Sequence, residues 1–188
     1  MDIKGFFFDL DGTLVDTHES NFRAYKKAIE DIKGIGLGEE LKDYIKAGES
    51  SAAFLPRLLP KATHDEIRAI NQRKKQHYPE QLHLSQLNKR LFAFLEQMSE
   101  HYITVLVTTA KKSNGLAVLR AHNLEQYFKT TVFGEEVSAM KPSPEAYLVA
   151  LEKTGLKASE VIAFEDSKRG LDAARAAGIK TVHVRNFL

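Results

Sequence analysis

Five short segments of the chain carry the hydrophobic pattern of strands that are buried on both faces. Each is nearly continuously apolar or β-branched, and none alternates like a strand with one face in water. The segments are residues 4–10, 103–108, 130–133, 161–164 and 181–184, of which 130–133 is the weakest. This pattern predicts a parallel sheet.

Segments with helical periodicity separate most of these strands. We expect helices at residues 85–100, 114–122, 144–154 and 168–177. Ser143 is a favourable N-cap before Pro144, and Gly155 is a typical stop at the other end of the same helix. Because strands and helices alternate, the pattern predicts an α/β fold with a doubly wound, Rossmann-like parallel sheet.

The long stretch after the first strand departs from this alternation and is helical throughout. Residues 63–66 form a capping-box pattern, which opens a helix expected to stop near Tyr78 because Pro79 follows. We therefore expect a small helical cap domain, residues 18–84, inserted into an α/β core domain made of residues 1–17 and 85–188.

Composition excludes several classes of protein. The chain has 188 residues, 43% of them hydrophobic and 28% charged, which is typical of a soluble globular protein. A formal net charge of +2 is too small to indicate a nucleic-acid partner. There is no cysteine, so disulfides, thiolate catalysis and cysteine zinc sites are excluded.

The hydrophobic segments are also too short for a membrane protein. None approaches the ~20 residues that a membrane span needs, and the N-terminus lacks the arrangement of a signal peptide. We therefore expect a cytoplasmic location, no membrane partner, and a monomer or weak homodimer.

Acidic residues follow two of the predicted strands at the point where each strand ends. Asp9 and Asp11 end the first strand, and Glu165 and Asp166 follow the strand at 161–164. The carboxyl ends of parallel strands meet at one edge of the sheet, where ligands bind. Four carboxylates gathered there repel one another unless a divalent cation joins them or one keeps its proton. Oxygen ligands of this kind suit Mg²⁺. One such pair fits ordinary surface acids equally well, but two pairs favour a site.

These segments resemble, in order and spacing, the four motifs of the haloacid dehalogenase superfamily. Residues 9–17, DLDGTLVDT, are similar to the first motif, Thr108 to the second, Lys141 to the third, and EDS at 165–167 to the fourth. The helical insertion resembles the first cap type of the family. Within the superfamily, residues 22–26 and 140–147 look similar to the β-phosphoglucomutase and phosphoglycolate phosphatase-like subgroup.

The resemblance implies phosphoryl transfer through an aspartyl-phosphate. Asp9 would be the nucleophile, and Asp11 the general acid and then the base that activates water. The side chains of Asp9 and Asp166 and the backbone carbonyl of Asp11 would hold Mg²⁺, with Glu165 supporting these ligands.

The resemblance also implies which residues bind the phosphate group. Thr108 and Lys141 would hold the phosphoryl oxygens, and Lys141 would also offset the charge on the nucleophile. Thr109 is the alternative hydroxyl, since the second motif is ambiguous by one position. Gly12, in the turn after the first strand, completes the phosphate-binding set.

The predicted function is hydrolysis of a small phosphorylated metabolite, such as a sugar phosphate or a phosphoglycolate-like acid. Asp11 favours a phosphate ester, because dehalogenases of the family need no acid for a halide leaving group. A β-phosphoglucomutase-like mutase is the alternative, but Asn21 stands where that enzyme has a histidine. A non-catalytic phosphate-binding or regulatory protein on the same scaffold is the second alternative.

Overall fold

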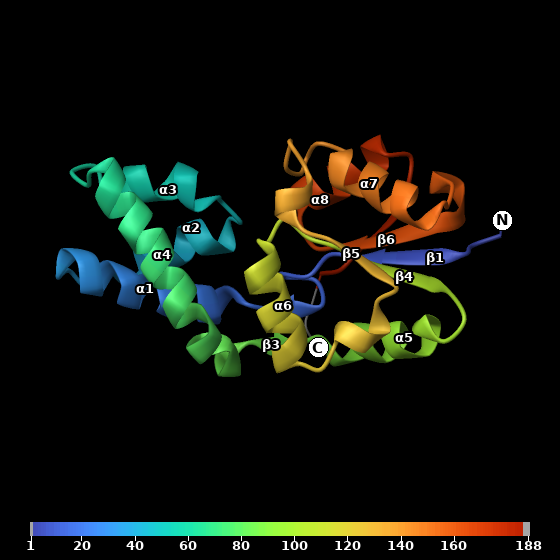
Figure 1. Cartoon of the computed structure of the whole chain (residues 1–188), viewed down its shortest axis with the longest axis horizontal. Coiled ribbons are helices and arrows are strands. Elements are labelled where there is room, and N and C mark those ends of the chain that lie inside the picture. Colours follow the sequence, from blue (N-terminus) through green and yellow to red (C-terminus); the bar gives the residue numbers. More distant parts are fainter. Residues whose placement is uncertain (1, 186–188) are drawn as a thin grey trace. The chain divides into compact units, whose positions relative to one another are not determined.

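A computed structural model describes residues 2–185 and divides the chain into two compact units. The core unit contains the residues up to Asp16 and those from Gln86 onward, and the helical unit is Thr17–Ser85. Figure 1 shows a sheet with helices in the core unit and helices alone in the helical unit. The predicted fold class, an α/β sheet with an inserted helical segment, is confirmed.

The core unit is built on a five-stranded sheet in the order β5-β4-β1-β6-β7, with every neighbouring pair parallel. The strands are β1 (Gly5–Phe8), β4 (Ile103–Val107), β5 (Thr130–Val132), β6 (Val161–Glu165) and β7 (Lys180–His183). Phe8 of β1 lies beside Leu106 on one side and Phe164 on the other. The acid that follows β1 therefore lies level with the ends of β4 and β6.

Helices cover both faces of this sheet (Figure 1). On one face lie α5 (Lys89–Ser99) and α6 (Lys112–Ala121), and on the other α7 (Glu145–Thr154) and α8 (Lys168–Ala176). Short 3₁₀ turns complete the connections at η2 (Glu125–Tyr127), η3 (Gly134–Glu136) and η4 (Ala158–Glu160).

The three phenylalanines of β1 pack on both faces of the sheet. Phe7 is fully buried in the cluster beneath α7 and α8, with Val105 and Ala163 from the neighbouring strands. Phe8 points to the other face, where its ring stacks on Phe164 with centroids 5.0 Å apart. A strand buried in this way needs apolar side chains at every position, which explains the absence of alternation.

Several predicted helix ends are wrong. One small error is at α7, where Pro144 rather than Ser143 is the N-cap. The two larger errors have local reasons. α5 begins at Lys89 rather than near residue 85, because Asn88 caps it by accepting a hydrogen bond of 3.2 Å from the Leu91 N–H. The residues before Asn88 instead form β3 (Gln86–Leu87), which pairs with β2 (Val15–Asp16) in an unpredicted antiparallel ribbon. The second is in α4 (His64–Gln81), which was expected to stop near Tyr78 but continues through Pro79. A proline in the last turn removes only one backbone hydrogen bond of the helix.

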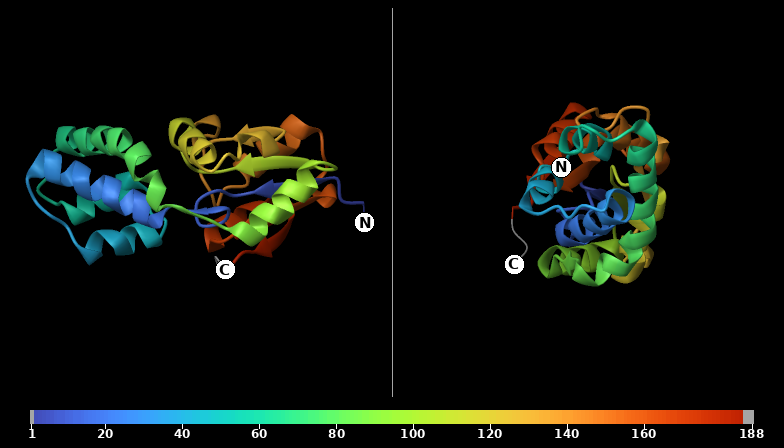
Figure 2. Two further views of the ribbon diagram at one scale, coloured as in Figure 1. Left: turned by 90° about the horizontal axis from the view of Figure 1, so that it is seen from below. Right: turned by 90° about the vertical axis from the view of Figure 1, so that its left-hand side faces the viewer.

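The helical unit packs its helices around a hydrophobic cluster that includes Phe22, Ile29, Phe54 and Ile70. Its elements are α1 (His18–Lys33), α2 (Glu39–Lys46), α3 (Ser51–Leu58), α4 and η1 (Leu82–Leu84). α1 and α4 lie side by side in both views of the ribbon (Figures 1 and 2).

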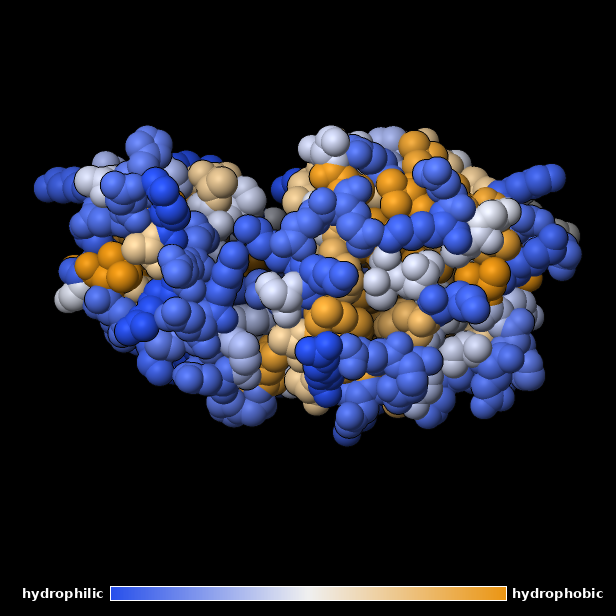
Figure 3. All heavy atoms as spheres, in the orientation of Figure 1, coloured by the Kyte–Doolittle hydropathy of each residue, from blue (hydrophilic) through white to orange (hydrophobic). Residues whose placement is uncertain are grey.

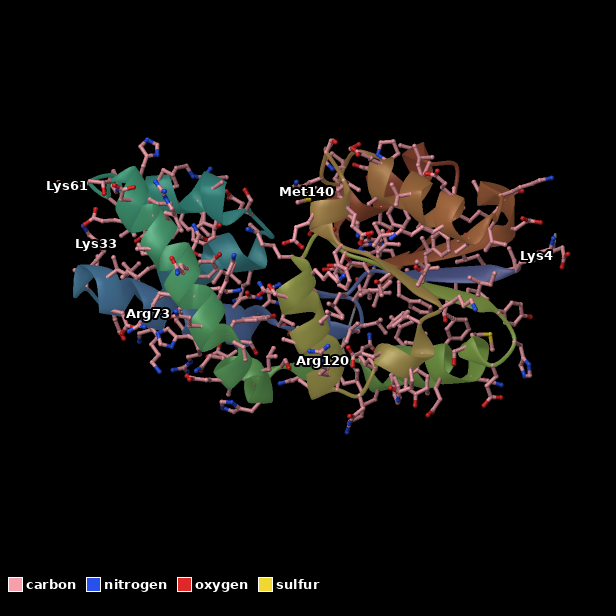
Figure 4. All side chains as sticks on the ribbon, in the orientation of Figure 1. Lys4, Lys33, Lys61, Arg73, Arg120 and Met140 are labelled. Carbon is pink, nitrogen blue, oxygen red and sulfur yellow. The ribbon has the colours of Figure 1, made fainter. Side chains whose placement is uncertain are left out.

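Polar contacts fix α1 and α4 of the helical unit. The capping box predicted at the start of α4 is confirmed, since Glu66 N–H donates to Thr63 Oγ1 at 3.2 Å and Thr63 N–H to Glu66 Oε2 at 2.7 Å. Lys33 and Arg73, labelled in Figure 4, pair with acids on the opposite helix at 2.6 Å and 2.7 Å. Ion pairs near the surface add little stability, so the apolar cluster carries most of the packing energy.

The visible surface of each unit is mostly hydrophilic, with smaller hydrophobic areas between the charged side chains (Figure 3). Within residues 2–185, no helix combines the length and the apolar character that crossing a membrane requires.

The central position of Phe7 yields a prediction about stability. Phe7→Ala should lower the free energy of unfolding by about 3–5 kcal/mol, because it removes a fully buried ring and leaves a cavity. Leu148→Ala on the exposed side of α7 is the control, with an expected change within about 0.5 kcal/mol. Urea unfolding followed by circular dichroism measures both, and equal effects would contradict the burial described for β1.

Candidate functional site

Asp9 is placed by the end of β1 and by the turn that follows it. Its N–H donates to the Phe164 carbonyl at 3.1 Å, which continues the sheet for one more residue. The chain then turns sharply, and the Leu10 carbonyl accepts hydrogen bonds from Thr13, Leu14 and Val15. The side chain of Asp9 is thereby held at the carboxyl edge of the sheet.

Three carboxylates meet at this edge. Asp9, Glu165 and Asp166 each offer an oxygen, and these oxygens lie within 4.8 Å of one another. The pairing of β1 with β6 explains this, because Asp9 and Glu165 each follow the paired residues Phe8 and Phe164. The two acidic segments, more than 150 residues apart in sequence, therefore form one cluster.

Lys141 brings a positive charge into the acid cluster from the loop before α7. Its ammonium donates to Asp9 Oδ1 at 2.7 Å, to Glu165 Oε1 at 2.5 Å and to the Val107 carbonyl at 2.8 Å. All three N–H donors of the ammonium are used. Lys141 is only 4% exposed, so these contacts are shielded from water.

The charges in this cluster shift the pKa values of its members. Burial alone would lower the pKa of Lys141, but the negative charges of Asp9 and Glu165 and their hydrogen bonds outweigh it and raise that pKa. Burial and the charge of Asp9 raise the pKa of Glu165 to about 8. The site therefore holds a firmly charged lysine and one carboxyl group that takes a proton readily.

Two further side chains hold the acids, and neither was predicted as a site residue from the sequence. Thr13 Oγ1 lies 3.1 Å from Asp9 Oδ2 and 3.2 Å from Asp166 Oδ1, so its hydroxyl links the two acidic segments. The fully buried Tyr147 on α7 donates from its hydroxyl to Glu165 Oε1 at 2.5 Å. The apolar pattern of α7 could have predicted that Tyr147 is buried. A buried tyrosine hydroxyl needs a hydrogen-bond partner, which pointed to a polar group nearby.

Two glycines allow the acids to come this close. Gly12 has a φ of +86°, and a Cβ there would overlap Asp166 Oδ2. A Cβ at Gly170, in the first turn of α8, would overlap Glu165 Oε2. Gly12 is thus required both by its backbone conformation and by the closeness of the Asp166 carboxylate. Gly170 is required only by the closeness of the Glu165 carboxylate.

The remaining predicted site residues lie around this cluster. Asp11 is half-buried in the turn after β1, and its backbone forms a bridge with Val15. Thr108 directly follows Val107, whose carbonyl accepts a hydrogen bond from Lys141. The Thr108 side chain is buried, and its Oγ1 accepts a hydrogen bond of 3.0 Å from the Ala110 N–H. Thr109 is exposed.

The acid cluster has the chemistry of a site for a divalent cation. Its carboxylate charges exceed the single positive charge of Lys141, and Mg²⁺ prefers oxygen ligands. Glu165 Oε2 is buried and has no hydrogen-bond partner among the described residues, so one oxygen remains to be satisfied. The residues present therefore fit a Mg²⁺ ion.

Comparisons with known proteins found a matching family model and several relatives. The model of the haloacid dehalogenase-like hydrolase family matches residues 6–184. A phosphorylated carbohydrates phosphatase of Thermotoga maritima is 33% identical over 96% of this chain and 84% of that protein. A phosphoglycolate phosphatase of Aliivibrio fischeri is 32% identical over 94% of this chain and 82% of that protein.

Among solved structures, the fold matches CbbY from Rhodobacter sphaeroides, which was determined in complex with phosphate. The TM-score is 0.86, with 22% sequence identity over 98% of this chain and 87% of that one. At this identity the match supports the fold only.

The raised pKa of Glu165 yields a prediction about pH. Between the ordinary carboxyl value of 4.5 and about 8, the folded protein holds a proton that the unfolded chain releases. Without divalent cations, the free energy of unfolding should therefore fall as pH rises through this window. Glu165→Gln cannot titrate and should flatten this dependence.

Urea unfolding in the presence of a chelator, at about pH 5 and about pH 9, measures the slope. Glu160→Gln is the control, because Glu160 is a carboxylate on the surface that pairs with Lys4 at 2.6 Å and has a lowered pKa. If Glu165→Gln and Glu160→Gln kept the same slope as the unchanged protein, the pH dependence would have another origin.

Proposed function

The chain belongs to the haloacid dehalogenase-like hydrolase family, and we propose that it hydrolyses a small phosphorylated metabolite through an aspartyl-phosphate on Asp9. It is a phosphoric monoester hydrolase, in keeping with its relatives. Two of these are named for phosphorylated carbohydrates and phosphoglycolate, which supports a sugar phosphate or a phosphoglycolate-like acid as substrate.

The contact between Lys141 and Asp9 is the observation that carries this proposal. The ammonium holds Asp9 Oδ1 at 2.7 Å, and the Thr13 hydroxyl lies 3.1 Å from Oδ2. Both contacts fix the orientation of the carboxylate, as a nucleophile requires. Asp9 is 7% exposed, so little water competes for these oxygens.

The reaction then proceeds in two balanced steps. In the first, an Asp9 oxygen forms a bond to phosphorus while the ester oxygen leaves, and Asp11 gives that oxygen its proton. In the second, Asp11 takes a proton from water, the water oxygen attacks phosphorus, and the bond to Asp9 breaks. Inorganic phosphate is released, and both aspartates return to their starting states.

Phosphate binding needs positive charge, because a phosphate dianion is repelled by carboxylates. Lys141 supplies one charge, and the Thr108 hydroxyl supplies a hydrogen bond to a phosphoryl oxygen. Asp9, Asp166 and the Asp11 carbonyl would hold Mg²⁺, with Glu165 supporting them. When bound, this ion supplies the further charge that lets the carboxylate approach phosphorus.

Two observations favour hydrolysis over the alternatives. Asn21, where the mutase has a histidine, donates its amide hydrogens to the carbonyl and hydroxyl of Thr17 at 3.1 Å and 3.2 Å, and an amide cannot carry a proton between groups. A non-catalytic protein has no need for a buried lysine that pairs with Asp9 at 2.7 Å. Cytoplasmic location and a monomeric or weakly dimeric state stay predictions from the sequence.

Asp9→Asn should lower phosphatase activity by at least about a thousand-fold, because an amide is not a nucleophile toward phosphorus. The assay is hydrolysis of an aryl phosphate with and without Mg²⁺, followed by a panel of phosphorylated metabolites. Asp172→Asn on α8, which removes an exposed pair with Lys168, should keep its activity within about twofold. Undiminished turnover in Asp9→Asn would refute the aspartyl-phosphate.

The two threonines after β4 can be separated by substitution. Thr108→Ala should lower kcat/KM about 10- to 100-fold, the value of a hydrogen bond to a charged oxygen, while Thr109→Ala changes it less than about threefold. Thr108→Ser keeps the hydroxyl and should restore most of the activity. The reverse order would assign the phosphate contact to Thr109.

A further inference from the structure

Arg169, in the first turn of α8, donates two hydrogen bonds to the backbone carbonyl of Lys141. Its Nε lies 3.1 Å and its Nη2 2.6 Å from that oxygen. We propose that Arg169 is a positioning residue, which fixes the backbone from which the Lys141 side chain reaches Asp9. The inference rests on the proposed function for its kinetic consequence, but the contact itself does not depend on it.

The loop that carries Lys141 has few other anchors. Met140, labelled in Figure 4, precedes Lys141, and Pro142 follows it without an N–H to donate. Upstream, the N–H groups of Ser138 and Ala139 both donate to the Glu145 carboxylate at 2.7 Å. That contact holds the loop to the start of α7, whereas Arg169 holds it at the lysine itself.

Arginine suits this task better than any other side chain. Its planar fork presents two donors in a fixed geometry, and a carbonyl oxygen has two lone pairs to accept them. A lysine at the same position has a longer flexible stem and can aim only one N–H at this single carbonyl oxygen.

The position of Arg169 in the chain joins two parts of the site. It lies three residues after Asp166, on the helix that Ser167 caps by accepting a hydrogen bond of 3.1 Å from the Gly170 N–H. One end of α8 therefore positions both the acids at the end of β6 and the backbone of Lys141. The relative position of the ammonium and the acids follows from this shared support.

The expected consequence is kinetic. The ammonium keeps three contacts of 2.5–2.8 Å, and a backbone shift of about 1 Å would break at least one of them. Arg169 touches none of the reacting atoms. Its loss should therefore lower kcat, through misplaced charge beside Asp9, and raise KM, because the same charge is proposed to bind the phosphate group.

Arg169→Gln should reduce kcat about 10- to 100-fold and raise KM several-fold, and Arg169→Lys should recover part of both changes. Arg175→Gln is the matched control, because Arg175 is an exposed arginine on the same helix that donates to Thr181 Oγ1 at 3.1 Å, away from the site. Its kcat should stay within about twofold of the unchanged protein. Because Arg169 is also exposed, its replacement leaves the apolar core intact.

A second measurement does not depend on activity. The ¹⁵N NMR signal of the Lys141 ammonium should be observable because the group is buried and ion-paired, and its loss in Lys141→Arg assigns it. This signal should shift or broaden in Arg169→Gln and Arg169→Lys, and stay in place in Arg175→Gln.

Unchanged kcat together with an unchanged ammonium signal in Arg169→Gln would overturn the inference. An equal loss of kcat in Arg169→Gln and Arg175→Gln would also overturn it, because it would indicate a general effect on α8. If Arg169→Gln does not fold, Arg169→Lys decides by the same two readouts. If the unchanged protein hydrolyses no phosphate ester, the proposed function fails, and the NMR signal alone decides the role of Arg169.

Discussion

The burial of one lysine ammonium between two carboxylates is the interaction on which the site depends. Lys141 compensates Asp9 and Glu165 where almost no water reaches, and a buried charge without such a partner is strongly destabilising. Because the ammonium uses all its donors, its position determines which oxygen of each carboxylate remains for other partners. The asymmetry of the site, with one charged lysine and an excess of acids, follows from this arrangement.

The α/β sheet makes this arrangement possible, because it already brings the ends of its strands together. A parallel sheet buried on both faces brings the ends of its strands to one edge, so acids at the ends of β1 and β6 meet there. The rigid strands hold the carboxylates, while the loop with Lys141 is held by contacts to α7 and α8. The nucleophile that we propose, Asp9, needs this rigidity, because a small displacement lowers the rate greatly.

Much of the fold and part of the site could be predicted because the signals are local. The apolar runs predicted the five strands of the sheet, and the capping box predicted the start of α4. The acids at strand ends and the family resemblance predicted Asp9, Asp166 and Lys141 as candidates. The errors were local too: Asn88 caps α5 later than the apolar pattern suggested, and α4 accommodates a proline in its last turn.

The sequence by itself therefore determined the fold class, the family and the types of side chain that face the sheet edge. Only the tertiary structure decided which atoms meet: the ammonium of Lys141 on Asp9, the hydroxyl of Tyr147 on Glu165 and the guanidinium of Arg169 on a backbone carbonyl. The physical reason is distance along the chain. Asp9 and Lys141 are 132 positions apart, so their contact depends on strand register and helix packing, which no local pattern records.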